Sequence, residues 1–257
     1  MKSKTTDEKL LDLFSDLDKQ HDFPVRELQK KVAIISTPRC GSSMFCDILR
    51  KTGVIGTPLE WVNMRYLGAY SKYFELNNID MSQYLDFIYR KTTSPNGIFA
   101  INFHIEQYVE MLKHKFNIFD LNFDKSYYLF RKEKINQAYS LAKASITDQW
   151  SFDTKSTNEL KSKIGREKIL QALIQISRSE DYYYDKNMKS FIDKEYFYED
   201  FSSLDTTSTF SEILCELEIP PSKTHWTTSM KKQSKEEDWS ELNTLKEYLS
   251  PSAIWEV

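Results

Sequence analysis

Four residues of the kinds that bind anions stand close together between Lys31 and Lys51: Arg39, Gly41, Ser42 and Ser43. Arginine carries a permanent charge and a planar fork of donors, and glycine permits a close backbone approach or a positive φ. If a helix begins here, its free N–H groups and the positive end of its dipole face one point. The pattern predicts a phosphate or sulfate site, although either serine alone is also compatible with an ordinary helix cap.

The segments on both sides of this loop predict a strand followed by a helix. Val32–Ile35 is an uninterrupted apolar run, typical of a strand buried on both faces of a parallel sheet. After the loop, apolar residues repeat at helical spacing at Met44, Phe45, Ile48 and Leu49. We expect Ser42 or Ser43 to cap this helix at its N-terminus, and Lys51 and Gly53 to close it.

A second predicted strand, Ile98–Phe103, carries two polar residues at its carboxyl end, Asn102 and His104. In open parallel sheets this end faces the ligand. Of the four histidines in the chain, His104 is the best placed to act as a base. The alternative is that His104 only caps the helix predicted at Ile105–Phe116.

A third predicted strand, Tyr127–Phe130, ends at Arg131, and the helix that follows it carries Ser140. A strand-end arginine and a helical serine at this spacing are able to hold a second anionic group together. Taken alone, Arg131 fits a surface charge just as well.

A carboxylate, Glu60, follows the turn Gly56–Pro58, soon after the first predicted helix. We expect this turn to bring Glu60 back toward that helix and near the anion site, where it would be available as a base. The alternative is an acidic residue that favours the N-terminus of a helix through the dipole.

The composition limits the class of protein. We divide the 257 residues into a polar extension at 1–30, with a short amphipathic helix at Leu10–Phe14, and a single domain at 31–257. A net charge of −3 argues against a basic field that recruits nucleic acid or an anionic membrane. The three cysteines lack metal-ligand spacing, and no apolar run approaches the ~20 residues of a membrane helix, which predicts a soluble, cytoplasmic protein.

Strand, loop and helix recur along the chain, which predicts an α/β fold of three layers, P-loop-like, with a central parallel sheet flanked by helices. Further helices are expected at Met81–Lys91, Ile164–Tyr184 and Phe210–Leu217, the second of them with Ile174 on its buried face. Another strand is expected at Phe191–Tyr198.

Three other kinds of chemistry lack their motifs in this chain. A nucleotide kinase would need Gly-x-x-x-x-Gly-Lys-Ser/Thr and an aspartate at the end of a strand for magnesium. A serine hydrolase would need Gly-x-Ser-x-Gly. A cysteine-dependent phosphatase would need an arginine six residues after Cys40, where Cys46 stands instead.

Three segments resemble the bacterial carbohydrate sulfotransferase family typified by trehalose sulfotransferase. They are Ser36–Met44, Gly53–Trp61 and Phe130–Leu141, in the order and with the spacing of that family. The resemblance covers roughly residues 30–150 well, and Tyr198–Phe201 and the region of Trp239 more loosely. It implies an enzyme that uses 3′-phosphoadenosine 5′-phosphosulfate (PAPS) as sulfuryl donor and needs no metal.

The resemblance also implies roles for the residues of the first loop. The backbone of Cys40, Gly41 and Ser42 would cradle the 5′-phosphosulfate, with Arg39 and Ser43 on its oxygens. Arg39 would in addition meet the negative charge that develops on the leaving group, which gives it a catalytic role.

At the other end of the donor, Arg131 and Ser140 match the pair that holds the 3′-phosphate in this family. Glu60 matches the family's proposed general base. His104 stays open as the alternative base.

Two positions depart from the family pattern. Cys40 stands where serine is usual, and Asn102 stands where a lysine is expected. These departures leave open a catalytically degenerate binding protein with the sulfotransferase fold. A nucleotide-binding, P-loop kinase-like protein is the other alternative.

The acceptor is the least specified partner. A hydroxyl of a small molecule, a sugar or a glycolipid fits the resemblance, and Trp61, Tyr66 and Tyr70 are candidates to stack on its ring. The mixed-charge segment Lys231–Trp239 is either a solvated face or a set of lysines that closes over a polyanionic ligand. The oligomeric state is open, a homodimer included.

Overall fold

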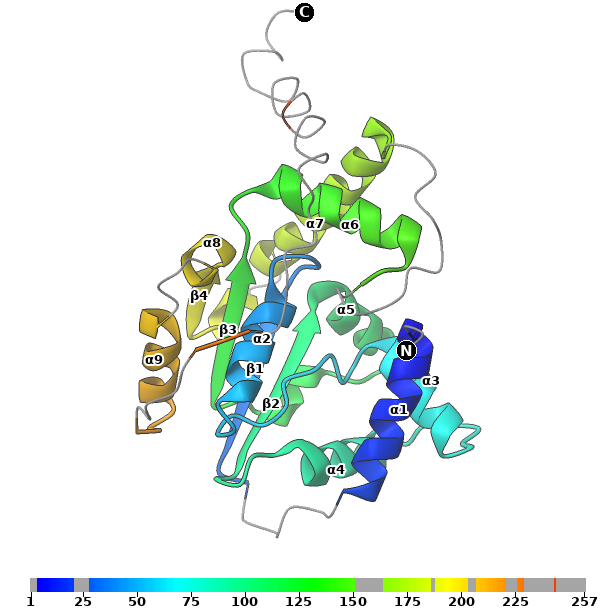
Figure 1. Ribbon diagram of the computed structural model, residues 1–257, viewed down its shortest axis with the longest axis vertical. Coiled ribbons are helices and arrows are strands. Elements are labelled where there is room, and N and C mark those ends of the chain that lie inside the picture. Colours follow the sequence, from blue (N-terminus) through cyan, green and yellow to red (C-terminus); the bar gives the residue numbers. More distant parts are fainter. Residues whose placement is uncertain are drawn as a thin grey trace, which may run out of the picture.

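The fold is built on a parallel sheet. It is seen in a computed structural model that describes residues 4–20, 28–150, 164–185, 188–202, 207–220, 226–228 and 243. Within these ranges the strands lie in the order β2-β1-β3-β4, and each neighbouring pair is parallel (Figure 1). The strands are β1 Lys30–Ser36, β2 Ile98–His104, β3 Lys125–Phe130 and β4 Lys194–Phe197. The central parallel sheet expected from the apolar runs is therefore confirmed.

Helices cover both faces of this sheet, which makes the three layers that were expected (Figure 1). Alternate residues of β1 point to opposite faces, so Val32 and Ile34 belong to one buried cluster and Ala33 and Ile35 to another. The first cluster is filled from α2 Ser42–Lys51 and α9 Thr207–Glu216. The second is filled from α1 Thr6–Lys19, α3 Met64–Tyr73, α4 Met81–Thr92 and α5 Ile105–Lys113.

The remaining described elements complete the chain between β3 and α9. Helices α6 Lys134–Thr147 and α7 Arg166–Asp185 pack on each other through a third apolar cluster. The strand expected at 191–198 is shorter than predicted, because a 3-10 turn occupies Met188–Phe191 and α8 occupies Tyr198–Phe201. Another 3-10 turn, at Ile118–Leu121, lies earlier in the chain, between α5 and β3.

The prediction for the buried face of α7 is wrong at Ile174, whose side chain is 51% exposed. The residues of α7 that are buried repeat every three or four positions: Ile169, Ala172, Ile176, Ser179 and Tyr183. Ile174 lies two positions from its neighbours in that series and so faces away from them.

The helix predicted near the N-terminus forms and packs into the core. It begins with a capping box, in which Thr5 N–H donates to Glu8 Oε2 and Glu8 N–H donates to Thr5 Oγ1. Leu10, Phe14 and Leu17 are buried in the same cluster as residues of β1, and α1 packs against α3. This packing fixes α1 on the layer that also carries α4 and α5.

The strand order brings two loops to the same edge of the sheet. From β1 the chain leads to β2 on one side, and from β2 it crosses to β3 on the other side of β1. Open α/β sheets bind ligands at the carboxyl ends of the strands where the order reverses in this way. The loop after β1 and Arg131, which follows β3, are therefore neighbours at the ligand side.

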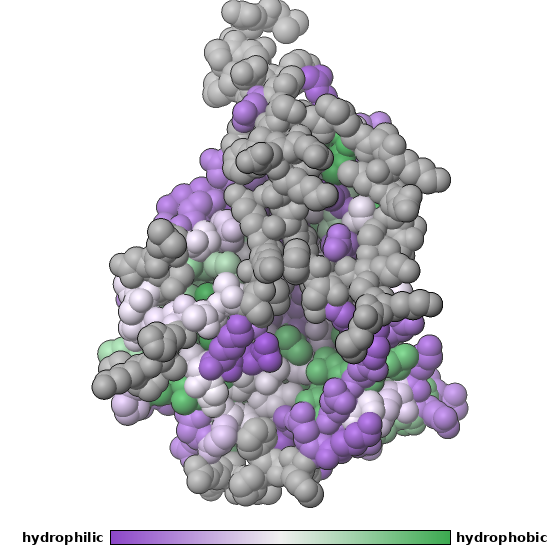
Figure 2. Space-filling view, viewed as in Figure 1, coloured by the Kyte–Doolittle hydropathy of each residue, from purple (hydrophilic) through white to green (hydrophobic). Residues whose placement is uncertain are grey.

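None of the helices in the described part of the chain has the length and apolar character that crossing a membrane requires. Small hydrophobic areas lie among hydrophilic residues on the face that Figure 2 presents. The mixed-charge segment Lys231–Trp239, which was singled out from the sequence, lies outside the described residues.

Candidate active site

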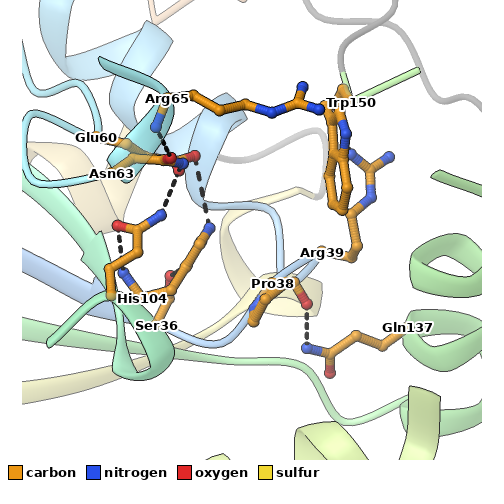
Figure 3. A network of polar contacts seen from close by, with 10 residues as sticks. Ser36, Pro38, Arg39, Glu60, Asn63, Arg65, His104, Gln137 and Trp150 are labelled. Carbon is orange, nitrogen blue, oxygen red and sulfur yellow. Dashed lines mark hydrogen bonds and ion pairs between the residues drawn. The ribbon is translucent and has the colours of Figure 1, made fainter. Parts of the chain in front are cut away.

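The loop between β1 and α2 is tied to α6 by one buried glutamine. Gln137 is fully buried, and its Nε2 donates to Thr37 Oγ1 at 2.9 Å and to Pro38 O at 2.7 Å. Figure 3 shows the second of these two bonds. Because Gln137 lies on the same helix as Ser140, the two halves of the predicted donor site are joined through this side chain. A fixed loop of this kind holds its backbone groups in place before a ligand arrives.

The helix after the loop begins differently from the prediction. Its N-cap is Gly41, with a φ of 94°, rather than Ser42 or Ser43. A Cβ at Gly41 would lie 2.3 Å from Tyr198 Cδ2, so glycine is required here for both conformation and space. Ser42 is buried and Ser43 is exposed, both inside the first turn of α2. A glycine cap has no side chain to satisfy the first N–H groups of the helix, and such an end favours an anionic ligand.

Replacing Gly41 with alanine is expected to destabilise the protein by about 1–3 kcal/mol, the usual cost of a strained backbone conformation, with the clash on Tyr198 in addition. Urea unfolding followed by circular dichroism measures this. Gly68→Ala is the matched control, because Gly68 lies within α3 and a Cβ there meets nothing within 4 Å. Equal unfolding midpoints for Gly41→Ala and the unchanged protein would contradict the role given to Gly41.

Arg39 lies at the centre of the loop and has a φ of 63°, which is uncommon for a residue with a side chain. Its Nε donates to Ser140 Oγ at 2.9 Å, and its Nη1 donates to Trp150 O at 2.6 Å. Burial lowers the pKa of the Arg39 guanidinium, and the nearby charge of Arg131 acts in the same direction. Arginine nevertheless keeps its proton in proteins, so the site holds a buried positive charge.

Arg131 stands beside the same loop. Its Nη1 donates to Arg39 O at 3.2 Å, and its guanidinium lies 4.7 Å from the ring centre of Tyr198. Its Nε is buried and has no hydrogen-bond partner within the part of the chain that the structure describes, although buried donors are normally satisfied. Two neighbouring guanidinium groups repel each other, and an anion between them would remove that cost. The structure thus brings together Arg39, Gly41, Arg131 and Ser140, while Ser140 bonds to Arg39 rather than to Arg131.

Glu60 lies across from the loop, at the carboxyl end of β2. Leu59 forms a parallel bridge to Ile101, which places the next residue at the edge of the sheet. Asn63 Nδ2 donates to Glu60 Oε2 at 2.7 Å, and Gln107 Nε2 donates to the same oxygen at 2.6 Å (Figure 3). The carboxylate is therefore held on a fixed side of the site by two amides from two helical segments.

His104 contacts the other oxygen of this carboxylate. Its Nε2 lies 3.5 Å from Glu60 Oε1, and its Nδ1 lies 2.8 Å from Ser36 Oγ. His104 is also the N-cap of α5, where its backbone N–H donates to Gln107 Oε1 at 3.2 Å. The backbone of His104 thus begins a helix, as one interpretation of the sequence expected, while its ring faces the candidate base.

The opposite charges of Glu60 and His104 stabilise each other. Burial by itself would raise the pKa of Glu60, but the charge of His104 and the hydrogen bonds from His104, Asn63 and Gln107 hold it at about 2. Burial by itself would lower the pKa of His104, but Glu60 raises it above its ordinary value. At neutral pH Glu60 is a carboxylate, and its charge favours the protonated form of His104.

The prediction that three aromatic residues are available to stack on the acceptor is wrong for two of them. Trp61 is fully buried and Tyr70 is 8% exposed, and both pack in the core cluster that includes Phe14. Tyr66 is only partly buried and packs edge-on against Trp61. The rings of Trp61 and Tyr70 therefore fill the layer beneath the site instead of lining it.

A different aromatic residue lies at the rim. Trp150, which sequence analysis did not single out, is partly exposed, and its Nε1 donates to Asp148 Oδ1 at 2.7 Å. The same oxygen accepts from Arg65 Nη2 at 2.8 Å, which links α3 to the end of α6. Figure 3 shows the side chain of Arg65 extending toward Trp150. Asn102, at the position where a lysine was expected, is 3% exposed, and none of the described residues forms a hydrogen bond with its Oδ1.

Sequence analysis missed four residues that position the site: Asn63, Gln107, Gln137 and Tyr198. For Gln107 a signal was present, because glutamine three residues after a helix cap is the spacing of a capping box. Asn63 likewise precedes α3 as a typical capping residue. Gln137 and Tyr198 act on segments far from them in the sequence and carried no such signal.

Among the residues that the structure describes, no group of three or more His, Cys, Asp or Glu side chains is arranged to hold a metal ion. Fold and site together define an α/β protein with a glycine-capped helix start after β1, two arginines beside it and a carboxylate–histidine pair opposite. A model of the Stf0 sulphotransferase family matches residues 32–242. The chain belongs to this family and is a sulfotransferase, so the resemblance stated from the sequence is confirmed.

Comparison with solved structures finds weaker likenesses. A sulfotransferase from Alicyclobacillus acidocaldarius has 13% identity and a TM-score of 0.49, over 84% of this chain and 91% of that one. Mouse sulfotransferase SULT7A1 complexed with PAP has 19% identity and a TM-score of 0.40, over 97% of this chain and 72% of that one. The sulfotransferase domain of the Synechococcus PCC 7002 olefin synthase has 13% identity and a TM-score of 0.38, over 91% of this chain and 100% of that one. No curated protein sequence matches the chain.

Proposed function

We propose that this sulfotransferase uses PAPS and moves its sulfuryl group to a hydroxyl of a carbohydrate or glycolipid acceptor. The observation that carries the proposal is the convergence of Arg39 and Arg131 beside the glycine-capped start of α2. One anion at that helix end and a second at Arg131 match a nucleotide with phosphate groups at both the 5′ and 3′ positions.

The first loop would hold the 5′-phosphosulfate. Backbone N–H groups of Cys40, Gly41 and Ser42 lie where the chain turns into α2, and Arg39 and Ser43 add side-chain donors. A cradle made from the backbone tolerates a cysteine in place of serine, because the side chain of Cys40 points into the core and is fully buried. The departure at Cys40 therefore does not weaken the proposal.

Arg131 and Ser140 would hold the 3′-phosphate. The buried Nε of Arg131 has no hydrogen-bond partner among the described residues, which fits a donor reserved for a ligand. Ser140 Oγ, now bonded to Arg39 Nε, can rotate to donate to a phosphate oxygen. The ring of Tyr198 stabilises the Arg131 guanidinium through a cation–π contact.

The reaction that follows is an in-line displacement at sulfur. The acceptor oxygen forms a bond to sulfur while the bond from sulfur to the 5′-phosphate oxygen breaks, and that oxygen leaves with the electron pair. Glu60 takes the proton of the acceptor hydroxyl, with His104 as the alternative base, and Arg39 meets the charge on the leaving oxygen. As in phosphoryl transfer, positioning and electrostatics would supply most of the acceleration.

Isothermal titration with adenosine 3′,5′-bisphosphate tests this function. Binding should persist in a chelator, whereas a kinase-like protein would bind ATP and depend on magnesium. Arg131→Ala should weaken the bisphosphate about 10–100-fold, since a hydrogen bond to a charged group is worth about 1.5–3 kcal/mol. The affinity for adenosine 5′-phosphate, which lacks the 3′-phosphate, should be almost the same in Arg131→Ala as in the unchanged protein. Equal losses for both ligands would overturn the assignment of Arg131.

We also propose a cytoplasmic location. Cys40, Cys46 and Cys215 are all free thiols, and Cys215 is exposed, which fits a reducing compartment.

A further inference from the structure

The carboxylate and the histidine opposite the loop belong to one hydrogen-bonded array. Ser36 from the end of β1, His104 from the end of β2 and Glu60 from the bridge beside β2 lie in a row. The parallel register pairs Ser36 with His104, so the first contact follows directly from the sheet. Figure 3 shows the array on one side of the site, with Arg39 and Trp150 on the other.

A lone glutamate in this state would be a poor base. Proton transfer is most efficient when the base has a pKa near the working pH, and the pKa of Glu60 is about 2 while His104 is charged. When His104 is neutral, the carboxylate loses the positive charge that suppresses its basicity. The basicity available at neutral pH therefore belongs to the two groups together.

We propose that Glu60 and His104 act as a single proton acceptor that works only when the pair carries one net negative charge, and that Gln107 and Asn63 are positioning residues for it. This inference rests on the proposed function, because it describes how the same site takes a proton. As the acceptor oxygen bonds to sulfur, its proton passes to the pair. The bisphosphate leaves with the electron pair of the broken S–O bond, and the protonated pair later releases its proton to water.

The groups around the pair set the direction of its pH dependence. Glu60 and Glu106, from the bridge beside β2 and from α5, both raise the pKa of His104. The negative charge of Glu60 also acts to raise the pKa of three other side chains, Arg39, Tyr66 and Cys46. Because the pKa of His104 lies above its ordinary 6.5, the active form is lost as the pH falls through a value above 6.5.

The pH dependence of kcat/KM for sulfuryl transfer tests this inference. In the unchanged enzyme the rate should fall by about tenfold per pH unit below an apparent pKa above 6.5. In His104→Gln this acid limb should move to the range of an isolated glutamate, near the ordinary value of 4.5 or below. His114→Gln is the matched control, since His114 also pairs with a glutamate, Glu110, but is 57% exposed and away from the site.

A second readout needs no turnover. The ring protons of His104, followed by NMR, should titrate above 6.5 in the unchanged protein and at lower pH in Glu60→Gln. Gln107→Leu should lower kcat about tenfold or more, because the Glu60 carboxylate loses an amide donor that fixes its position. The KM for the donor should stay unchanged.

The outcomes separate this inference from the proposed function. Absence of bisphosphate binding and of sulfuryl transfer would overturn the function. Normal transfer with a rate that is flat between pH 5.5 and 8, or a His104 titration indifferent to Glu60→Gln, would overturn the pair alone. An acid limb above 6.5 in the unchanged enzyme that moves to the range of an isolated glutamate in His104→Gln supports the pair.

Discussion

Glu60→Gln is expected to lower turnover by about 10²–10⁴-fold, the usual contribution of a positioned acid or base, while the affinity for adenosine 3′,5′-bisphosphate stays the same. Glutamine keeps the size and shape of the side chain but cannot take a proton. The amides of Asn63 and Gln107, which now donate to Glu60 Oε2, still have an oxygen to bond. Single-turnover rates with PAPS, together with calorimetric titration of the bisphosphate, measure the two effects separately.

Glu110→Gln serves as the control for this prediction. Glu110 also contacts a histidine and a lysine, His114 and Lys113, but it lies on the exposed side of α5. Its removal should leave turnover unchanged. If turnover instead survives in Glu60→Gln, Glu60 is not the base, the pair is not the proton acceptor, and His104 alone becomes the preferred base.

The second large effect is expected at Arg39. Arg39→Met should lower turnover by about 10²–10³-fold, the loss typical of removing a donor that meets developing charge, and should also weaken the bisphosphate. The guanidinium lies at the loop with two neutral oxygens, Ser140 Oγ and Trp150 O, among its acceptors. Both can be exchanged for the oxygens of a phosphosulfate, which carry more charge. Stopped-flow or quench measurements of sulfuryl transfer give the rate.

Arg39→Lys distinguishes charge from geometry. Lysine restores one positive charge but not the planar fork, so a partial recovery of the rate is expected. Arg90→Met is the control, because Arg90 forms an exposed pair with Asp86 on α4, and Figure 1 shows α4 well apart from the start of α2. A rate in Arg39→Met equal to that of the control would show that the loop does not act on the leaving group.

The sheet could be predicted because each of its first three strands is a continuous apolar run that fits burial on both faces. The residue that caps the N-terminus of α2 could not be predicted in this way. Serine is a good N-cap by local preference, but the space beside residue 41 is filled by Tyr198 from a distant segment, and only glycine fits there. Local preference was overruled by a contact that the sequence does not reveal.

The site was predicted in outline. Arg39, Arg131 and Ser140 converge because the loop after β1 and the end of β3 are neighbours in the sheet order. The environment of Glu60 was not predictable, since its partners come from α5 and from the turn before α3. Whether these residues bind the donor stays a prediction that the experiments above decide.

The error over the aromatic residues has a physical origin. An aromatic side chain near a site looks the same in sequence whether it lines a pocket or fills the layer below it. Trp61 donates its Nε1 to Thr57 O, and Tyr84 donates to Trp61 O, so these large rings are satisfied within the core. The division of the chain at residue 30 and the homodimer stay predictions.

A crystal structure of the protein with adenosine 3′,5′-bisphosphate tests the central claim most directly. We expect the 5′-phosphate against the backbone N–H groups of Cys40–Ser42, beside Arg39, and the 3′-phosphate within hydrogen-bonding distance of Arg131 and Ser140. A nucleotide bound away from Arg39, or a loop that stays closed by side chains at high nucleotide concentration, would contradict the account.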